Sequence, residues 1–199
     1  FSLSGVNANG LVIGNNECYA ETDFKEEGRS HPQMARQILQ EAETLDDART
    51  FFDTKQHATA ETLVISDPVT DQAAAFEMSA THMGERGLSA DGVVYATNHF
   101  EHQDMREIDV ERGEDHDTRT RYTRFGQLLE PGGGDSLHGK IDPAAAIAVL
   151  RDAYNPFTEE IHPPDLIDGG GSIGNNGSVH SMIFLPARRT FYVSMGEQP

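Results

Sequence analysis

The spacing of apolar residues predicts short strands near the start, in the middle and at the end of the chain. Apolar residues alternate in residues 1–6 and continue in 11–16, and the Asn-Ala-Asn-Gly sequence between them is typical of a hairpin turn. Further along, three runs of apolar and small residues are separated by Asp, Pro and Gly residues, which favour turns. These runs predict a three-stranded meander at 61–68, 72–80 and 92–98.

Apolar residues at helical spacing predict four helices. Ser30, Thr44 and Asp142 are suited to cap three of them, because a short polar side chain can accept a hydrogen bond from a backbone N–H of the first turn. The apolar positions that identify the helices are Met34, Ile38 and Leu39 after Ser30; Ala48, Phe51 and Phe52 after Thr44; Tyr122, Phe125, Leu128 and Leu129 before the Pro-Gly-Gly-Gly sequence at 131–134; and the alanine-rich run 144–149 after Asp142.

The end of the chain predicts a long loop followed by a second hairpin. Residues 155–177 are rich in Pro and Gly, and the apolar runs 178–186 and 190–196 are joined by Ala-Arg-Arg. Strands, helices, strands, helices and strands in this order are typical of an α+β fold with antiparallel sheets. At 199 residues the chain has room for one domain, which we place over residues 1–199.

The charge of the chain limits its partners. There are 33 acidic against 15 basic residues, for a formal net charge of −18. Such a surface repels phosphate groups, so nucleic acid and anionic membranes are not expected as partners. The sequence contains no apolar run of the length that spans a membrane, which favours a soluble protein, cytoplasmic rather than secreted. The single cysteine, Cys18, excludes an intramolecular disulfide and leaves the compartment open.

The histidines raise the possibility of a metal site. His99 and His102 have the spacing of two metal ligands, and Asp104 lies close by in the sequence, but a further ligand would have to come from elsewhere in the chain. Histidines in a solvated loop are the simpler interpretation, so a metal-dependent hydrolase is a third hypothesis. The glycine-rich stretch 168–177 lacks the lysine and hydroxyl of a phosphate-binding loop and predicts a flexible loop instead.

Cys18 and three asparagines are candidates for acyl-transfer chemistry. Cys18 is a possible nucleophile, although no base stands beside it in the sequence, and an inert, partly buried thiol is the alternative. Asn15 and Asn16 end the second predicted strand, and Asn98 ends the strand 92–98. A carboxamide held at a strand end can donate to an oxygen that becomes negative during acyl transfer. The alternative is that each asparagine only caps a turn.

Four segments resemble, in order, those of N-terminal-nucleophile amide hydrolases. Residues 4–16 are similar to the first hairpin of the branch that contains acyl-coenzyme A:6-aminopenicillanic acid acyltransferases, and Thr-Asn-His at 97–99 is similar to a motif of the same branch. Residues 117–129 resemble its helix with two spaced arginines, here Arg121 and Arg124, and 180–199 resemble its closing hairpin. More distant relatives of the branch are the choloylglycine hydrolases and penicillin V acylases.

The resemblance implies a four-layer αββα sandwich and assigns roles to several residues. It makes Asn98 the side-chain oxyanion donor, places Asn16 beside the oxyanion, and puts His99 and Phe100 in a loop that lines the substrate pocket. A late arginine of many members is missing, and its position falls near Asn175. Asn175 and Cys18 are further candidates for residues of the substrate pocket. The implied function is hydrolysis or acyl transfer at a carbon–nitrogen amide bond, with a small-molecule amide or acyl substrate. The reaction would pass through an acyl-enzyme formed by a Cys, Ser or Thr nucleophile, and it needs no metal or organic cofactor.

The nucleophile itself is not matched. In the enzymes that the chain resembles, it is the first residue of a chain exposed by autoproteolysis, and the match here begins at a later hairpin. We therefore expect the nucleophile to come from an upstream segment or a separate chain, which would make the assembly incomplete without it and possibly a hetero-oligomer. Two alternatives stay open: a non-catalytic binding or assembly subunit of the same fold, and Cys18 acting as an unconventional nucleophile.

Overall fold

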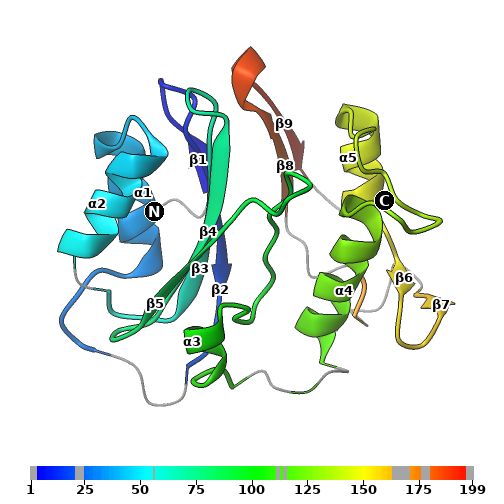
Figure 1. The fold of residues 1–199 in the computed structure, drawn as a ribbon, viewed down its shortest axis with the longest axis horizontal. Coiled ribbons are helices and arrows are strands. Elements are labelled where there is room, and N and C mark those ends of the chain that lie inside the picture. Colours follow the sequence, from blue (N-terminus) through cyan, green and yellow to red (C-terminus); the bar gives the residue numbers. More distant parts are fainter. Residues whose placement is uncertain are drawn as a thin grey trace. The chain divides into compact units, whose positions relative to one another are not determined.

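The structure is a computed structural model that describes residues 4–20, 25–55, 57–110, 113, 116–162, 171–175 and 180–195. Its contacts group into two compact units, and each is considered by itself (Figure 1). Unit 1 comprises residues 1–111 with 185–190, and unit 2 comprises 112–184 with 191–199. Helices and antiparallel sheets confirm the predicted α+β class and are compatible with a sandwich fold. The prediction of one domain over the whole chain stays a prediction.

Unit 1 is built on a five-stranded antiparallel sheet in which strands follow one another in chain order. The first hairpin is confirmed from residue 4 onward; residues 1–3 lie outside the described residues. Asn7 closes its turn, because the Asn7 side-chain oxygen accepts the backbone N–H groups of Asn9 and Leu11, each at 3.0 Å. Gly10 adopts a φ of 92°, which glycine tolerates best. The strands are β1 (Ser4–Val6), β2 (Val12–Glu17), β3 (Glu61–Asp67), β4 (Gln72–Met78) and β5 (Met83–Gly87).

Two helices, α1 (His31–Glu41) and α2 (Leu45–Thr54), pack against one face of this sheet (Figure 1). Both start where the sequence predicts, after Ser30 and Thr44, and the Thr44 hydroxyl accepts the backbone N–H of Asp47 at 3.2 Å. Their apolar stripes and the facing strand residues share one core. It contains, among others, Met34, Ile38, Phe51 and Phe52 from the helices and Ile13, Leu63, Ile65, Phe76 and Met78 from the sheet.

The third strand of the meander lies earlier than predicted. The prediction of a strand at 92–98 is wrong, since residues 93–97 join no sheet, and β5 at Met83–Gly87 pairs with β4 instead. The sequence of β5, Met-Gly-Glu-Arg-Gly, carries little apolar signal because it forms the sheet edge. Residues 93–96 are apolar or aromatic but only half-buried. A short helix that the pattern did not predict, α3 (Gln103–Arg106), follows.

Unit 2 contains the predicted third and fourth helices, α4 (Asp117–Leu129) and α5 (Pro143–Leu150), the latter capped by Asp142 as expected. The stretch predicted as a loop, 155–177, starts within a small two-stranded sheet, β6 (Tyr154–Asn155) and β7 (Glu160–Ile161), while 163–170 and 176–177 lie outside the described residues. The closing hairpin, β8 (His180–Leu185) and β9 (Thr190–Met195), is confirmed for the described part of its strands.

A buried arginine organises unit 2. Arg124 of α4 is only 6% exposed and forms two hydrogen bonds with the carboxylate of Asp152, at 2.9 and 2.8 Å. The Arg124 guanidinium also donates to Asp135 at 2.9 Å and lies 4.7 Å from the centre of the Tyr154 ring. Such a planar, forked cation can connect several segments at once. No helix in the described ranges is long and apolar enough to span a membrane.

Candidate active site

A row of four residues crosses the sheet of unit 1 on the face opposite α1 and α2. Asn16 pairs with Thr62, Thr62 with Glu77, and Glu77 with Gly84. Residues that pair directly across antiparallel strands point to the same face of a sheet, so this row forms one continuous stripe over β2, β3, β4 and β5. Thr62 and Glu77 are both fully buried.

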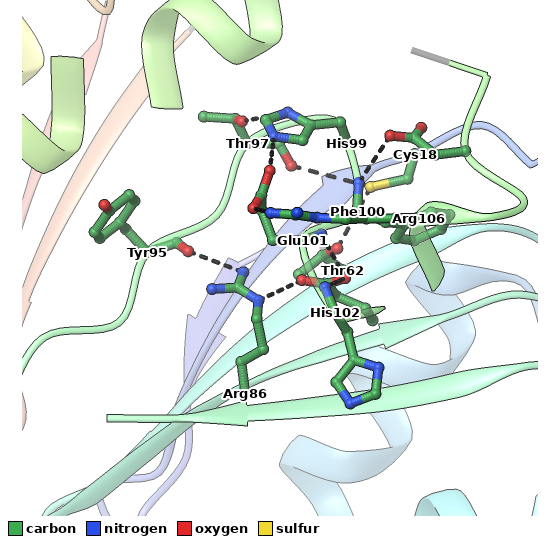
Figure 2. A network of polar contacts seen from close by, with 12 residues as sticks. Cys18, Thr62, Arg86, Tyr95, Thr97, His99, Phe100, Glu101, His102 and Arg106 are labelled. Atoms are coloured by element: carbon green, nitrogen blue, oxygen red, sulfur yellow. Dashed lines mark hydrogen bonds and ion pairs between the residues drawn. The ribbon is translucent and has the colours of Figure 1, made fainter. Parts of the chain in front are cut away.

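Residues 95–102, which we call the crossing segment, lie over this stripe (Figure 2). The Glu77 carboxylate accepts the backbone N–H groups of Glu101 at 2.8 Å and His102 at 2.7 Å. Gly84 leaves room for the His102 side chain, because a Cβ at position 84 would lie 2.3 Å from the imidazole Cγ. The buried Asp109 carboxylate accepts the N–H of Phe100 at 3.4 Å. The carboxylates of Glu77 and Asp109 thus accept backbone N–H groups of the crossing segment, which in a sheet would donate to a neighbouring strand.

The crossing segment brings Asn98 to the end of β2. The Asn98 Nδ2 donates to the backbone oxygen of Glu17 at 2.9 Å, and Glu17 directly follows Asn16. Both asparagines are half-buried. The side-chain amide of Asn98 is therefore oriented by the backbone of β2, next to the other candidate oxyanion donor.

Cys18 directly follows the end of β2 and is 3% exposed. The Cys18 sulfur lies 3.4 Å from the Thr62 hydroxyl, and its single S–H has two possible backbone acceptors, the oxygens of Asn16 at 3.8 Å and Thr97 at 4.0 Å. Burial strongly raises the pKa of the Cys18 thiol; the hydrogen bond with Thr62 acts in the opposite direction, and nearby carboxyl groups add to the increase. A thiol in this state is a poor nucleophile, which favours the structural interpretation of Cys18.

A chain of polar contacts fixes the residues on either side of Asn98 (Figure 2). His99 is 2% exposed, and its Nδ1 lies 3.0 Å from the Thr97 hydroxyl while its Nε2 lies 2.8 Å from a Glu101 carboxylate oxygen. Glu101 also forms an ion pair with Arg106. Burial by itself would raise the pKa of Glu101, but the hydrogen bonds from His99 and Arg106 outweigh it and lower the pKa to about 2.

Comparison with known proteins identifies the family. The family model described as acyl-coenzyme A:6-aminopenicillanic acid acyl-transferase matches residues 2–198. The chain belongs to this family. The match confirms the resemblance to the acyltransferase branch and implies an acyltransferase or amide hydrolase of the N-terminal-nucleophile class. No individual curated protein matches the chain.

The two histidines of the His-x-x-His sequence do not converge on one point. Figure 2 shows the His99 and His102 rings on different sides of the crossing segment. Both ring nitrogens of His99 have protein partners, and the His102 Nδ1 accepts the N–H of Asp104 at 3.3 Å. In the described part of the chain, no three His, Cys, Asp or Glu side chains are grouped as metal ligands. Among the described residues, His99 and His102 are therefore not arranged as two ligands of one metal ion, and the metal-dependent alternative is untested.

The remaining candidate residues lie in different surroundings. Phe100 is fully buried and packs with Cys18, Ala60 and Met105, so its ring belongs to a core cluster of unit 1. Asn175 belongs to unit 2, where its Nδ2 donates to the backbone oxygen of Ser172 at 3.2 Å and closes a local loop. A pocket-lining role for His99, Phe100, Asn175 and Cys18 in this acyltransferase-family chain stays a prediction.

Sequence reasoning missed Glu77, Arg86 and Asp109, which hold the crossing segment. The available signal was a glutamate between Phe76 and Met78 in a strand that is otherwise apolar and small. A charged residue in such a strand is rarely buried without a partner. The partner, Arg86, is on the neighbouring strand, and its Nε lies 2.5 Å from the Glu77 carboxylate.

Proposed function

We propose that this protein cleaves or forms carbon–nitrogen amide bonds through an acyl-enzyme, and that Asn98 stabilises the oxyanion, with Asn16 contributing beside it. The observation that carries the proposal is the Asn98 amide, which is bound to the Glu17 carbonyl at 2.9 Å next to Asn16, in a chain of the acyltransferase family. A donor that is already oriented does not have to reorganise when negative charge develops on the substrate.

The proposed reaction has two half-reactions. A thiol or hydroxyl nucleophile attacks the amide carbonyl, and the carbonyl oxygen takes up negative charge in the tetrahedral intermediate. The Asn98 amide, oriented by its hydrogen bond to the Glu17 carbonyl, donates to this oxygen in the proposed mechanism. The intermediate collapses, the amine leaves with a proton from the base, and water or another amine then takes the acyl group. Holding the acyl group against the donors adds an entropic advantage.

The nucleophile, in this proposal, is the first residue of a segment or chain outside residues 1–199, and its own α-amine acts as the base. Two arguments support this. Family membership implies the N-terminal-nucleophile class. Cys18, the sole thiol of the sequence, is 3% exposed, and its burial raises the pKa and disfavours the thiolate.

Replacing Asn98 tests the proposal. In the complete enzyme, we expect Asn98→Ala to lower kcat by about 10²- to 10³-fold with little change in KM, because the lost donor acts mainly in the transition state. Asn9→Ala is the matched control, since Asn9 lies in the exposed turn of the first hairpin. Steady-state amidase or acyl-transfer kinetics measure both. Turnover close to wild type in Asn98→Ala would show that the assignment is wrong.

A non-catalytic assembly subunit of the same fold is the second candidate. The observation that favours it is the apolar surface of β9, where Phe191, Tyr192 and Val193 are 55%, 46% and 41% exposed. Exposed apolar residues on a two-stranded sheet favour association with a further strand or chain. The kinetic test above also decides this case, because an assembly subunit would contribute no residue whose replacement alters kcat at constant KM.

A further inference from the structure

We infer that Glu77, together with Arg86, is a positioning residue for the Asn98 amide. The inference rests on the proposed function, because it assigns Glu77 the task of setting the geometry of the oxyanion donor. Glu77 is buried in the middle of β4 and points to the face that the crossing segment covers.

The Glu77 carboxylate binds the crossing segment after Asn98. One carboxylate oxygen accepts two successive backbone N–H groups, those of Glu101 and His102, at 2.8 and 2.7 Å. Successive N–H groups that point the same way form a concave anion site, and here a carboxylate from the sheet occupies it. Hydrogen bonds to an ionised acceptor are stronger than those between neutral groups, so this attachment is firm.

Arg86 binds the crossing segment before Asn98. The Arg86 Nε donates to the other Glu77 oxygen at 2.5 Å, and the Arg86 Nη2 donates to the backbone oxygen of Tyr95 at 3.1 Å (Figure 2). The ion pair therefore holds the chain three residues before and three to four residues after Asn98. Because β4 and β5 carry the two side chains, the rigid sheet sets the position of the segment.

These contacts fix the position of the Asn98 amide relative to the sheet. The segment is fixed at Tyr95 and at Glu101 by the ion pair, and Asn98 completes the attachment through the Glu17 carbonyl. A loop held only by the last contact would sample other orientations. A displacement of about 1 Å at a catalytic group can cost about 100-fold in rate.

The test is Glu77→Gln in the complete enzyme, alone and combined with Asn98→Ala. An amide at position 77 cannot accept both backbone N–H groups and pair with Arg86 as the carboxylate does. We expect kcat to fall about 10- to 100-fold with KM nearly unchanged, and we expect less than about a 2-fold further loss when Asn98 is already alanine. A loss that multiplies fully in the double variant would show that Glu77 acts independently of Asn98, and the inference would be overturned.

A matched control lies on the other face of the same sheet. Glu85 of β5 pairs with Arg49 of α2, with a distance of 2.7 Å between Glu85 Oε1 and Arg49 Nη2. Glu85→Gln removes a glutamate–arginine pair from the sheet without touching the crossing segment, so kcat should stay within about 2-fold of wild type. A loss as large as that of Glu77→Gln would indicate a general effect on the sheet and contradict the inference.

A second readout does not depend on turnover. The side-chain amide signals of Asn98 in a ¹⁵N NMR spectrum, assigned by their loss in Asn98→Ala, should shift or broaden in Glu77→Gln and stay in place in Glu85→Gln. If Glu77→Gln does not fold, Arg86→Lys serves instead, since a lysine keeps the charge but cannot bridge Glu77 and the Tyr95 carbonyl as a guanidinium does. Unmoved Asn98 signals would refute positioning by Glu77 even if the kinetic role of Asn98 holds. Wild-type turnover in Asn98→Ala would refute only the oxyanion role.

Discussion

At the residue scale, the two buried glutamates of the sheet differ in their partners. Glu77 forms an ion pair with Arg86, whereas Glu61, on the face that α1 and α2 cover, has no cationic partner among the described residues. Glu61 is fully buried at the start of β3, and Asn15 donates to its Oε2 at 2.8 Å. Its Oε1 has no hydrogen-bond partner among the described residues. Burial raises the pKa of Glu61 to about 8, although the hydrogen bond from Asn15 acts in the opposite direction. Burial therefore favours the protonated form of Glu61 in the folded protein.

This raised pKa predicts a loss of stability as pH rises. The folded protein keeps a proton on Glu61 up to a pKa of about 8, and the unfolded chain releases it near 4.5, the ordinary pKa of a glutamate. The free energy of unfolding should then fall by about 1.4 kcal/mol per pH unit between these values from this group alone. Glu61→Gln removes the titratable carboxyl group. The free energy of unfolding, measured by urea unfolding between pH 5 and 8, should then depend less on pH. The exposed Glu17, which pairs with Glu61 across β2 and β3, is the control, and Glu17→Gln should keep the slope.

At the element scale, single charged side chains bind segments that no sheet or helix joins. Glu77 does so for the crossing segment, and Arg124 does so for α4 and the chain around Asp152. These contacts are long-range in sequence and buried. Removal of one member leaves the other desolvated without a partner, which costs more than the net stabilisation by the pair.

Arg124→Met should destabilise unit 2 by about 3–5 kcal/mol, because it leaves the carboxylate of Asp152 without its cation in a mostly buried place. Arg36→Met on α1 is the control, since Arg36 is exposed and its replacement should change the free energy of unfolding by less than about 0.5 kcal/mol. Urea unfolding followed by circular dichroism measures both. A cost below about 1 kcal/mol for Arg124→Met would mean that the forked ion pair does not hold α4 in place.

At the scale of the whole molecule, the protein carries the proposed oxyanion donor Asn98 and a buried thiol with a raised pKa. We therefore expect native material to contain a segment or partner chain that begins with Cys, Ser or Thr. Intact mass and N-terminal sequencing of the protein purified from its source would detect it. Active material in which alkylation of Cys18 alone abolishes turnover, with no such segment present, would contradict this expectation and favour Cys18 as the nucleophile.

The sequence by itself determined the parts of the fold that depend on local chemistry. The side-chain caps at Thr44 and Asp142, the helix start after Ser30, the helix stripes and both terminal hairpins follow from short-range hydrogen bonding and from the period of apolar residues. At Ser30 the Gln33 side-chain oxygen accepts the Ser30 N–H, and the Ser30 hydroxyl does not accept a first-turn N–H as predicted. Asn16 and Asn98 were also visible as candidates, because carboxamides next to apolar runs stand out in the sequence.

Only the tertiary structure decided which segment completes the meander and how Asn98 is held. The apolar run 92–98 has the composition of a strand, yet β5 takes the edge of the sheet. The Glu77 carboxylate binds the backbone N–H groups of Glu101 and His102, which follow that run. The strand propensity of residues 92–98 cannot predict this arrangement, because the hydrogen bonds that hold the crossing segment come from side chains that are distant in sequence. The free energy of burying Glu77 with Arg86 and two backbone N–H groups depends on three segments meeting in space.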